Sequence, residues 1–165
     1  MDNNSCGAKC ATDHKKCCVV KSCLLPAFAV FVVFMLSEGL LHHVLLMPAY
    51  QATAAVWRPA AQMQDYFYIH LIRNAVVALI MTCLYNCIAS GAVQQGKCPV
   101  GKGAKFGLKI GVIIGITNFG TVAYLPIPMS LALSWLVGYA LIGLLAGIVL
   151  GLIYHKCNND KIGNA

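Results

Sequence analysis

The chain has 165 residues, enough for one domain, and its composition excludes an ordinary soluble globule, because 59% of the residues are hydrophobic and only 10% are charged. A net charge of +7 would suit a nucleic-acid partner if the basic residues shared one polar surface. They lie instead beside and between long apolar runs. The charge therefore indicates membrane topology and contact with the lipid bilayer, and no nucleic acid is expected as a partner.

Four apolar runs reach the roughly 20 residues that a bilayer-spanning helix requires. The sequence therefore predicts an all-α integral membrane protein, a four-helix bundle made of two antiparallel hairpins. The predicted parts are a Cys- and Lys-rich tail at residues 1–23, a transmembrane domain at 24–156 with spans at 24–47, 66–89, 106–125 and 130–154, and a short tail at 157–165.

The lysines predict the orientation of the spans. They cluster before the first span, around the second connection and after the fourth span, whereas the first connection holds only Arg58 and the third holds no basic residue. Positively charged segments stay on the cytoplasmic side. Both termini and the second connection are thus predicted to be cytoplasmic, in a multi-pass protein of the bacterial inner membrane.

Cysteines are the first candidate ligands along the chain. The tail reads CGAKCATDHKKCCVVKSC, and two further cysteines share a face near the inner end of the second span. Thiolates and imidazole bind soft metal ions such as Zn, Cu or Hg-like ions, although the spacing matches no zinc finger. The candidate metal ligands are Cys6, Cys10, His14, Cys17, Cys18, Cys23, Cys83 and Cys87.

Two other interpretations of these cysteines stay open, namely small apolar packing residues and redox-sensing or lipid-modified thiols. The vicinal pair Cys17-Cys18, together with Cys83 and Cys87, resembles small mercury-transport proteins, which carry vicinal cysteines at a membrane span. The resemblance implies that a soft ion is handed from the tail to the second span. This chain differs from those proteins, because its vicinal pair precedes the first span instead of lying within it.

Ionisable residues interrupt the first two spans in their outer halves. Glu38 and His42 are four residues apart, and His70 and Arg73 are three apart, so each pair shares one helix face. Facing residues of an antiparallel hairpin have a constant sum of residue numbers, which places Glu38 level with Arg73 and His42 level with His70. A charge at this depth is costly unless it is paired inside the bundle. We therefore predict a Glu38–Arg73 ion pair.

Three further polar residues, Asn74, Asn118 and Tyr139, fall at a similar depth and could complete a pocket open to the outside. The pocket could lock the register of the bundle, or bind a small ligand, proton or metal, or consist of unrelated lipid-interface positions. A metal held by Glu38 and the two histidines is chemically possible, but the neighbouring arginine opposes a cation. The mixed charges favour a proton or anion pathway.

Glycines recur at four-residue spacing in the third and fourth spans. Such glycines let helix backbones approach closely in a membrane. The constant-sum rule predicts the facing pairs Gly107–Gly151, Gly111–Gly147, Gly115–Gly143 and Gly120–Gly138. The competing use of these faces is homodimerisation. The segment GKCPVGKGAKFG, which precedes the third span, is expected to form a flexible loop.

The segments SEGLLHHVLLMPAY, GAKFGLKIGVIIG and AGIVLGLIY, with an arginine-bearing second span, resemble small four-span bacterial membrane proteins of a family of unknown function. The resemblance implies a four-helix membrane fold and no established activity. The Cys-rich tail departs from that family.

The function expected from these features is the handling or transport of a small ion. The ion is either a soft metal at the inner cysteines, or a proton or anion at the outer Glu/His/Arg pocket. The alternative is a non-catalytic subunit or assembly factor of a larger membrane complex, in which the glycine-rich faces serve a homo-oligomer or other partners. No catalytic residue is predicted, and an enzyme is not expected.

Overall fold

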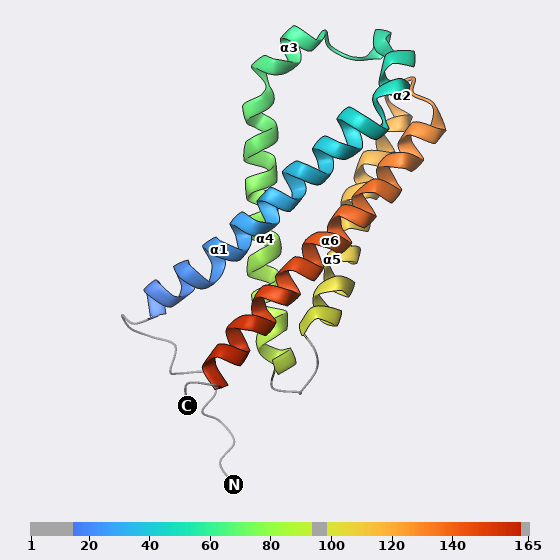
Figure 1. The fold of residues 1–165 in the computed structure, drawn as a ribbon. Helices are drawn as coiled ribbons and strands as arrows, with labels where there is room; N and C mark the ends of the chain where they lie inside the picture. Colours follow the sequence, from blue (N-terminus) through green and yellow to red (C-terminus); the bar gives the residue numbers. More distant parts are fainter. Residues whose placement is uncertain (1–14, 94–98, 163–165) are drawn as a thin grey trace.

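The structure is a computed structural model that describes the backbone of residues 15–93 and 99–162. In these two ranges the regular structure is entirely helical, and four helices are long and apolar enough to cross a membrane (Figure 1). This confirms the predicted all-helical class, and the length and composition of the four helices fit a multi-pass membrane protein. The span-length segments are Cys23–Leu45, Phe67–Cys87, Pro99–Ala123 and Met129–His155.

The long helices are joined by short ones. In chain order the elements are α1 (Lys15–Leu40), a π-helical turn η1 (Leu41–Leu45), α2 (Met47–Ala52), a 3-10 turn η2 (Ala54–Val56), α3 (Ala60–Asp65), α4 (Phe67–Val93), α5 (Pro99–Phe119), a 3-10 turn η3 (Gly120–Ala123) and α6 (Met129–Ile162).

The third spanning helix begins earlier than predicted, at Pro99 instead of residue 106. The expectation of a flexible loop is wrong for this part of the segment. A proline fits the first turn of a helix, where its missing N–H would have no partner in any case. Gly103 is buried against α6 and holds this turn to the bundle. Packing against α6 therefore stabilises a helix in a stretch that is rich in Gly and Lys.

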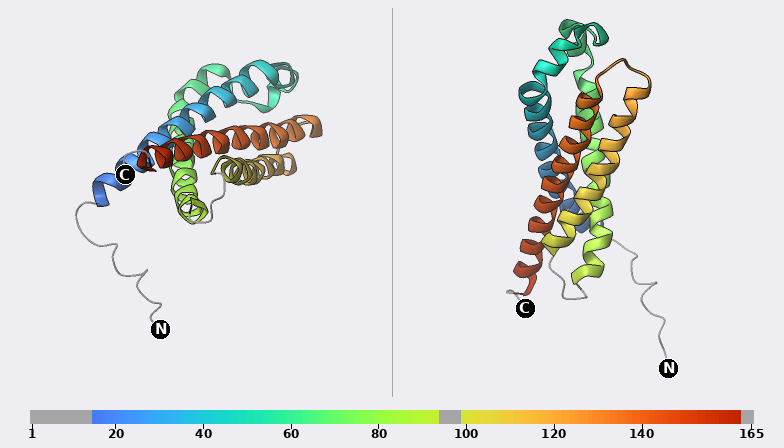
Figure 2. Two further views of the ribbon diagram at one scale, coloured as in Figure 1. Left: turned by 60° about the horizontal axis from the view of Figure 1, so that its bottom comes forward. Right: turned by 90° about the vertical axis from the view of Figure 1, so that its right-hand side faces the viewer.

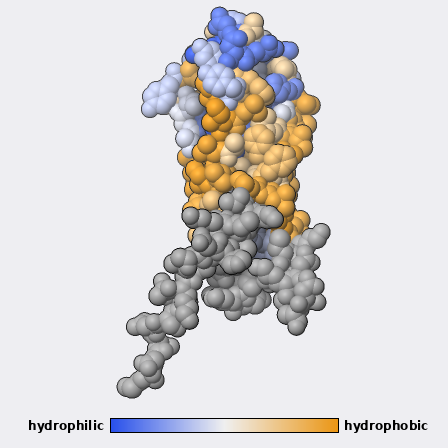
Figure 3. Space-filling model, turned by 90° about the vertical axis from the view of Figure 1, so that its left-hand side faces the viewer, coloured by the Kyte–Doolittle hydropathy of each residue, from blue (hydrophilic) through white to orange (hydrophobic). Residues whose placement is uncertain are grey.

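α6 lies at the centre of the arrangement, between α1 and α5, while α4 packs against α1 and α5 (Figures 1 and 2). α1 begins and α6 ends at the same end of the bundle, which we call the terminal end (Figure 1). The opposite end carries α2 and α3, and we call it the α2–α3 end. In the space-filling view, polar residues gather at the α2–α3 end and a broad apolar band follows below it (Figure 3).

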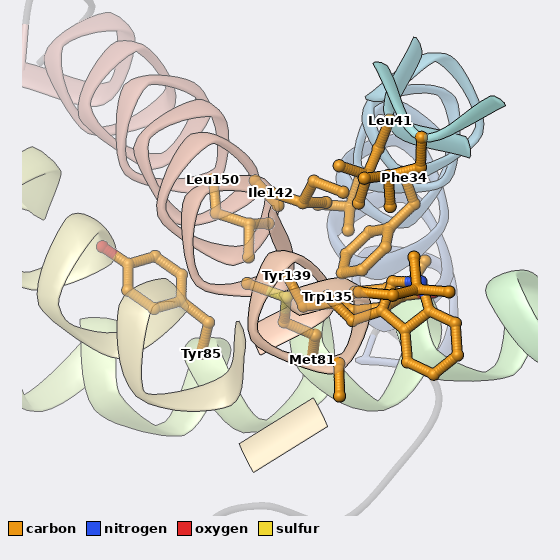
Figure 4. Close-up of a cluster of buried hydrophobic side chains, with 14 of the residues drawn as sticks. Phe34, Leu41, Met81, Tyr85, Trp135, Tyr139, Ile142 and Leu150 are labelled. Carbon is orange, nitrogen blue, oxygen red and sulfur yellow. The ribbon is translucent and has the colours of Figure 1, made fainter. Parts of the chain in front are cut away.

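The buried core is a cluster of apolar side chains that come mainly from α1, α4 and α6. Phe34 of α1, Met81 of α4 and Ile142 of α6 belong to one cluster and are nearly inaccessible (Figure 4). Large apolar residues also cover much of the exposed surface of the spans, as expected where lipid takes the place of water. The cluster extends along the bundle, from Leu46 and Ile127 at the α2–α3 end to Tyr85 and Leu150 toward the terminal end.

α5 and α6 make the closest approach in the fold. A Cβ added to Gly107 would come within 2.7 Å of the Cα of Gly147, and one added to Gly143 within 2.5 Å of the Cα of Gly111. Such distances leave no room for a side chain at the interface. The glycines thus allow backbone to pack on backbone.

The pairing of these glycines differs from the predicted register. The observed neighbours are Gly103 with Gly147 and Gly151, Gly107 with Gly143 and Gly147, Gly111 with Gly143, and Gly115 with the backbone of Leu136. The prediction centred the connection on Met129, but α5 continues through η3 to Ala123 and α6 starts only at Met129. The observed glycine pairs are centred about three residues before Met129, so every predicted pair is displaced.

The pair Gly120–Gly138 is not formed. A Cβ on Gly120 would meet nothing within 4 Å, whereas one on Gly138 would collide with the side chain of Leu41 in η1. Gly138 therefore packs α6 against the first span instead of against α5.

Candidate functional site

The carboxylate of Glu38 is the centre of a polar cluster inside the bundle. Its side chain is 2% exposed. Arg73 donates to it through Nη2, at 2.7 Å from Oε1 and 2.8 Å from Oε2. Asn74 donates through Nδ2 at 2.7 Å, and His70 Nε2 lies 3.2 Å from Oε2. Three side chains of α4 thus surround one acid of α1, which meets the requirement that a buried charge be paired and hydrogen-bonded.

Asn74 holds the two charged groups together. It is buried, and its Oδ1 accepts from Nε and Nη2 of Arg73 at 3.2 and 3.1 Å, while its Nδ2 donates to Glu38. One amide therefore bridges the cation and the anion. The spacing of α4 makes this possible, since residues 70, 73 and 74 share one helix face.

His42 occupies a second polar position, in the π-helical turn that follows α1. Its Nδ1 is 2.5 Å from the hydroxyl of Tyr50, and its Nε2 is 3.3 Å from the hydroxyl of Tyr139. Tyr50 also accepts from Nε1 of Trp135 at 2.7 Å. The indole N–H can only donate, so the Tyr50 proton is free to point at Nδ1. That arrangement places the hydrogen of a neutral His42 on Nε2, facing Tyr139.

A widened π-helical turn gives His42 this orientation. Leu41–Leu45 is π-helical and carries the His42-His43 pair, and such turns often occur at functional sites. The turn directs His42 toward α2 and α6. The sequence arithmetic instead placed His42 level with His70, but its hydrogen bonds run to the two tyrosines, and His70 bonds the Glu38 group.

Tyr139 connects the two polar positions. Its hydroxyl bonds His42 and also neighbours the Glu38–Arg73 pair. The ring belongs to α6 and is buried in the core (Figure 4). A chain of ionisable groups therefore runs from His70 through Glu38 and Tyr139 to His42.

Tyr50, which lies in α2 beyond the spans, continues this chain into an aromatic group. Its ring packs edge-on against Trp57, with centroids 5.4 Å apart, and lies 6.5 Å from Trp135. Burial raises the pKa of the Tyr50 phenol, although the Trp135 hydrogen bond acts in the opposite direction. The phenol is therefore neutral at ordinary pH.

One side of the cluster opens to the surface. A shallow groove of about 600 Å³ runs along the start of α4, and Arg73 and His70 are part of its lining. Their side chains are 45% and 34% exposed. His70 thus contacts the buried carboxylate while also facing the groove.

Asn118 takes no part in this cluster. Its Nδ2 donates to the carbonyl oxygen of Ile114, one turn earlier in its own helix, at 2.9 Å. α5 lies on the far side of α6 from α1. Equal depth in the membrane was therefore not enough to predict contact.

Tyr50 and Trp135 are members of the site that sequence reasoning did not select. Neither residue was among the predicted members of the pocket. The available signal was a group of aromatic residues in segments that meet at one end of the bundle. Only the path of α2 decides which of them reaches a histidine.

The thiols lie near the terminal end. Cys23 of α1 hydrogen-bonds with Cys83 of α4, accepts from Nδ2 of Asn86 at 2.8 Å, and has Cys87 close by. The same Asn86 accepts from the hydroxyl of Tyr154 on α6. α1, α4 and α6 are therefore joined here by a polar contact that includes two sulfur atoms.

The remaining predicted ligands cannot be placed. Cys6, Cys10 and His14 lie outside the described residues, as do the side chains of Cys17 and Cys18. Within the part of the chain that is described, no group of three or more His, Cys, Asp or Glu residues is arranged to hold a metal ion. This applies to Glu38 with its two histidines, because Arg73 and Asn74 occupy the carboxylate.

Comparison of the chain with protein-family models, curated proteins and solved structures gave no match. The functional argument therefore depends on the geometry of the cluster and on the chemistry of its residues.

Proposed function

We propose that this protein carries a small ion across a membrane, that the ion is a proton, and that Glu38 binds it. The proposed orientation has two antiparallel hairpins with both termini in the cytoplasm, which puts the α2–α3 end outside. The placement of the lysines supports this orientation, and so does the common end at which α1 begins and α6 ends.

The observation that carries the proposal is the double contact of His70. It lies 3.2 Å from the buried carboxylate and also lines the open groove. Histidine is the side chain best suited to take up and release protons near neutral pH. His70 can therefore pass a proton between the groove and Glu38, and Tyr139 can extend the path to His42.

A proton fits this cluster better than other small ions do. Arg73 disfavours a metal cation, while its pairing with Glu38 leaves little net charge to draw a soluble anion inward. An intramembrane carboxylate with histidine neighbours is the usual composition of a proton relay. The paired charges hold the site together in either protonation state of His70.

The type of transport depends on the buried apolar side chains between the cluster and the terminal end. Phe34, Met81 and Ile142 lie about one to two turns closer to the terminal end than the cluster and are buried together. They close the site on that side. A proton can pass only if these side chains rearrange, so we propose a carrier that opens alternately and not a permanent channel.

Proton flux into liposomes tests the proposal. Purified full-length protein is reconstituted with a pH-sensitive dye inside, and a potassium diffusion potential drives protons inward. We expect acidification faster than in protein-free liposomes, and a loss of at least about tenfold in Glu38→Gln, which keeps the shape but cannot ionise. Asn118→Ala serves as the control, because that side chain bonds only its own helix among the described contacts.

Two results would contradict the proposal. One is a wild-type flux equal to that of protein-free liposomes, and the other is an unchanged flux in Glu38→Gln. A common elution volume and thermal unfolding temperature establish that each variant is folded. Copurification with a larger complex, combined with absent flux, would favour a subunit or assembly role.

Soft-metal handling is a second candidate, and the contact between Cys23 and Cys83 supports it. Two thiolates are enough for a linear Cu(I)-like ion. Titration with Ag(I), a redox-stable substitute for Cu(I), checks this candidate. We expect the Cys83→Ser variant to bind one Ag(I) equivalent fewer than the wild-type protein. Equal binding by the variant and the wild type would exclude this pair as a site.

A further inference from the structure

The groove at the start of α4 has a composition that proton transfer does not explain. Two arginines line it from different segments, Arg58 from the connection after η2 and Arg73 from α4. Among the described residues no Asp or Glu is part of the lining, although Asp65 is adjacent in sequence to the lining residue Tyr66. Arg73 is already paired with Glu38, so the positive charge of the groove comes mainly from Arg58.

Each arginine is held in place by neighbouring side chains. The guanidinium carbon of Arg58 lies 4.5 Å from the centre of the Tyr66 ring, and this stacking fixes the plane of the fork without using an N–H. Arg73 bonds Glu38 and Asn74 through Nε and Nη2, and its side chain is still 45% exposed. Positioned guanidinium groups are well suited to bind the oxygen atoms of a phosphate.

Three further lining residues are apolar. Met63, Phe67 and Ile69 are each about half exposed, at 50%, 52% and 50%. Phe67 also stacks on His70, with ring centroids 5.9 Å apart. A soluble anion would leave these apolar surfaces uncovered. A ligand with a negative head and a hydrocarbon tail would satisfy both kinds of surface.

The level of the groove selects the source of such a ligand. The groove lies where the spanning part of α4 begins, at Phe67, and the aromatic residue Tyr66 is part of its lining. Aromatic residues of this kind mark the headgroup level of a bilayer. We propose that the groove binds an anionic phospholipid, with its phosphate between Arg58 and Arg73 and an acyl chain along Met63, Phe67 and Ile69.

The inference does not depend on proton transport, because Arg58 is not part of the Glu38 cluster. The test is a titration of the full-length protein, in mild detergent, with phosphatidylglycerol, followed by native mass spectrometry. We expect the dissociation constant of the first bound lipid to rise about tenfold in Arg58→Gln. Lys109→Gln on α5 removes the same charge away from the groove and should leave it unchanged.

Three results would overturn the inference. The first is equal affinity of Arg58→Gln and Lys109→Gln. The second is phosphatidylcholine binding as tightly as phosphatidylglycerol, which would show that the negative charge is not recognised. The third is displacement of the lipid by millimolar inorganic phosphate, which would identify a soluble anion as the ligand. Proton flux is also measured on Arg58→Gln. An unchanged flux would show that the carrier proposal stands whatever the outcome for the lipid site.

Discussion

Arg73 and Glu38 are bound through a single nitrogen, Nη2, that reaches both carboxylate oxygens at 2.7 and 2.8 Å. The two partners differ in their surroundings, because the acid is 2% exposed and the guanidinium 45%. Losing one partner therefore has a different consequence from losing the other. The same contact holds α1 against α4 and keeps the proposed proton site in place.

The first prediction is an asymmetric double-mutant cycle for this pair. Arg73→Ala leaves a buried carboxylate without its cation and should lower the free energy of unfolding by about 3 kcal/mol. Glu38→Ala leaves a half-exposed guanidinium and should cost less. The double variant should be more stable than Arg73→Ala alone. SDS titration measures the free energy of unfolding of the wild type, the two single variants and the double variant. Additive effects of the single changes would show that the residues do not interact.

A second prediction concerns the hydroxyl of Tyr50, which bonds both His42 and Trp135. Tyr50→Phe removes two hydrogen bonds and leaves two partners unsatisfied, so we expect a loss of about 2 kcal/mol. Thermal unfolding and the near-ultraviolet circular dichroism of the tryptophans provide the measurements. Tyr124→Phe is the control, because Tyr124 is 87% exposed. Equal effects of the two changes would show that the buried hydroxyl has no special role.

The sequence predicts those parts of this molecule that follow from helix periodicity and the cost of buried charge. Four long apolar runs mean four spanning helices. Glu38 and Arg73 are identified together because neither can face lipid alone, and their positions in neighbouring spans match. Asn74 was added because it lies at a similar depth, next to Arg73 in the sequence.

Other features depend on geometry that the residue pattern does not contain. The contact of His42 with Tyr50 requires a π-helical turn and the return of α2 over the bundle. The glycine register depends on how far α5 continues before the chain turns, and Gly103 was missed because its neighbours are polar. Asn118 was included only because its depth is similar, although another helix stands between.

A third prediction uses the neighbouring thiols of Cys23 and Cys83. In a variant that keeps only these two cysteines, mild oxidation should form a disulfide between α1 and α4. After proteolysis in the connection between them, the fragments should stay together on a non-reducing gel and separate on reduction. The same protein with Cys83→Ser provides the control. Absence of cross-linking in the two-cysteine protein would show that these thiols do not meet.

The last prediction separates close packing from helix propensity. Gly107→Ala would put a methyl group within 2.7 Å of the Cα of Gly147, a backbone atom that cannot move aside as a side chain could. α5 and α6 must then separate, with an expected loss of about 1–3 kcal/mol.

Gly39→Ala in α1 is the matched control, because a methyl group there would meet nothing within 4 Å. Alanine is the better helix former, so this change should stabilise the protein by about 0.5–1 kcal/mol. SDS titration should therefore show that the same Gly→Ala change lowers the free energy of unfolding at position 107 and raises it at position 39. If both variants gained stability, the α5–α6 interface would be looser than its glycines indicate, and those glycines would be free to serve contacts between two copies of the chain.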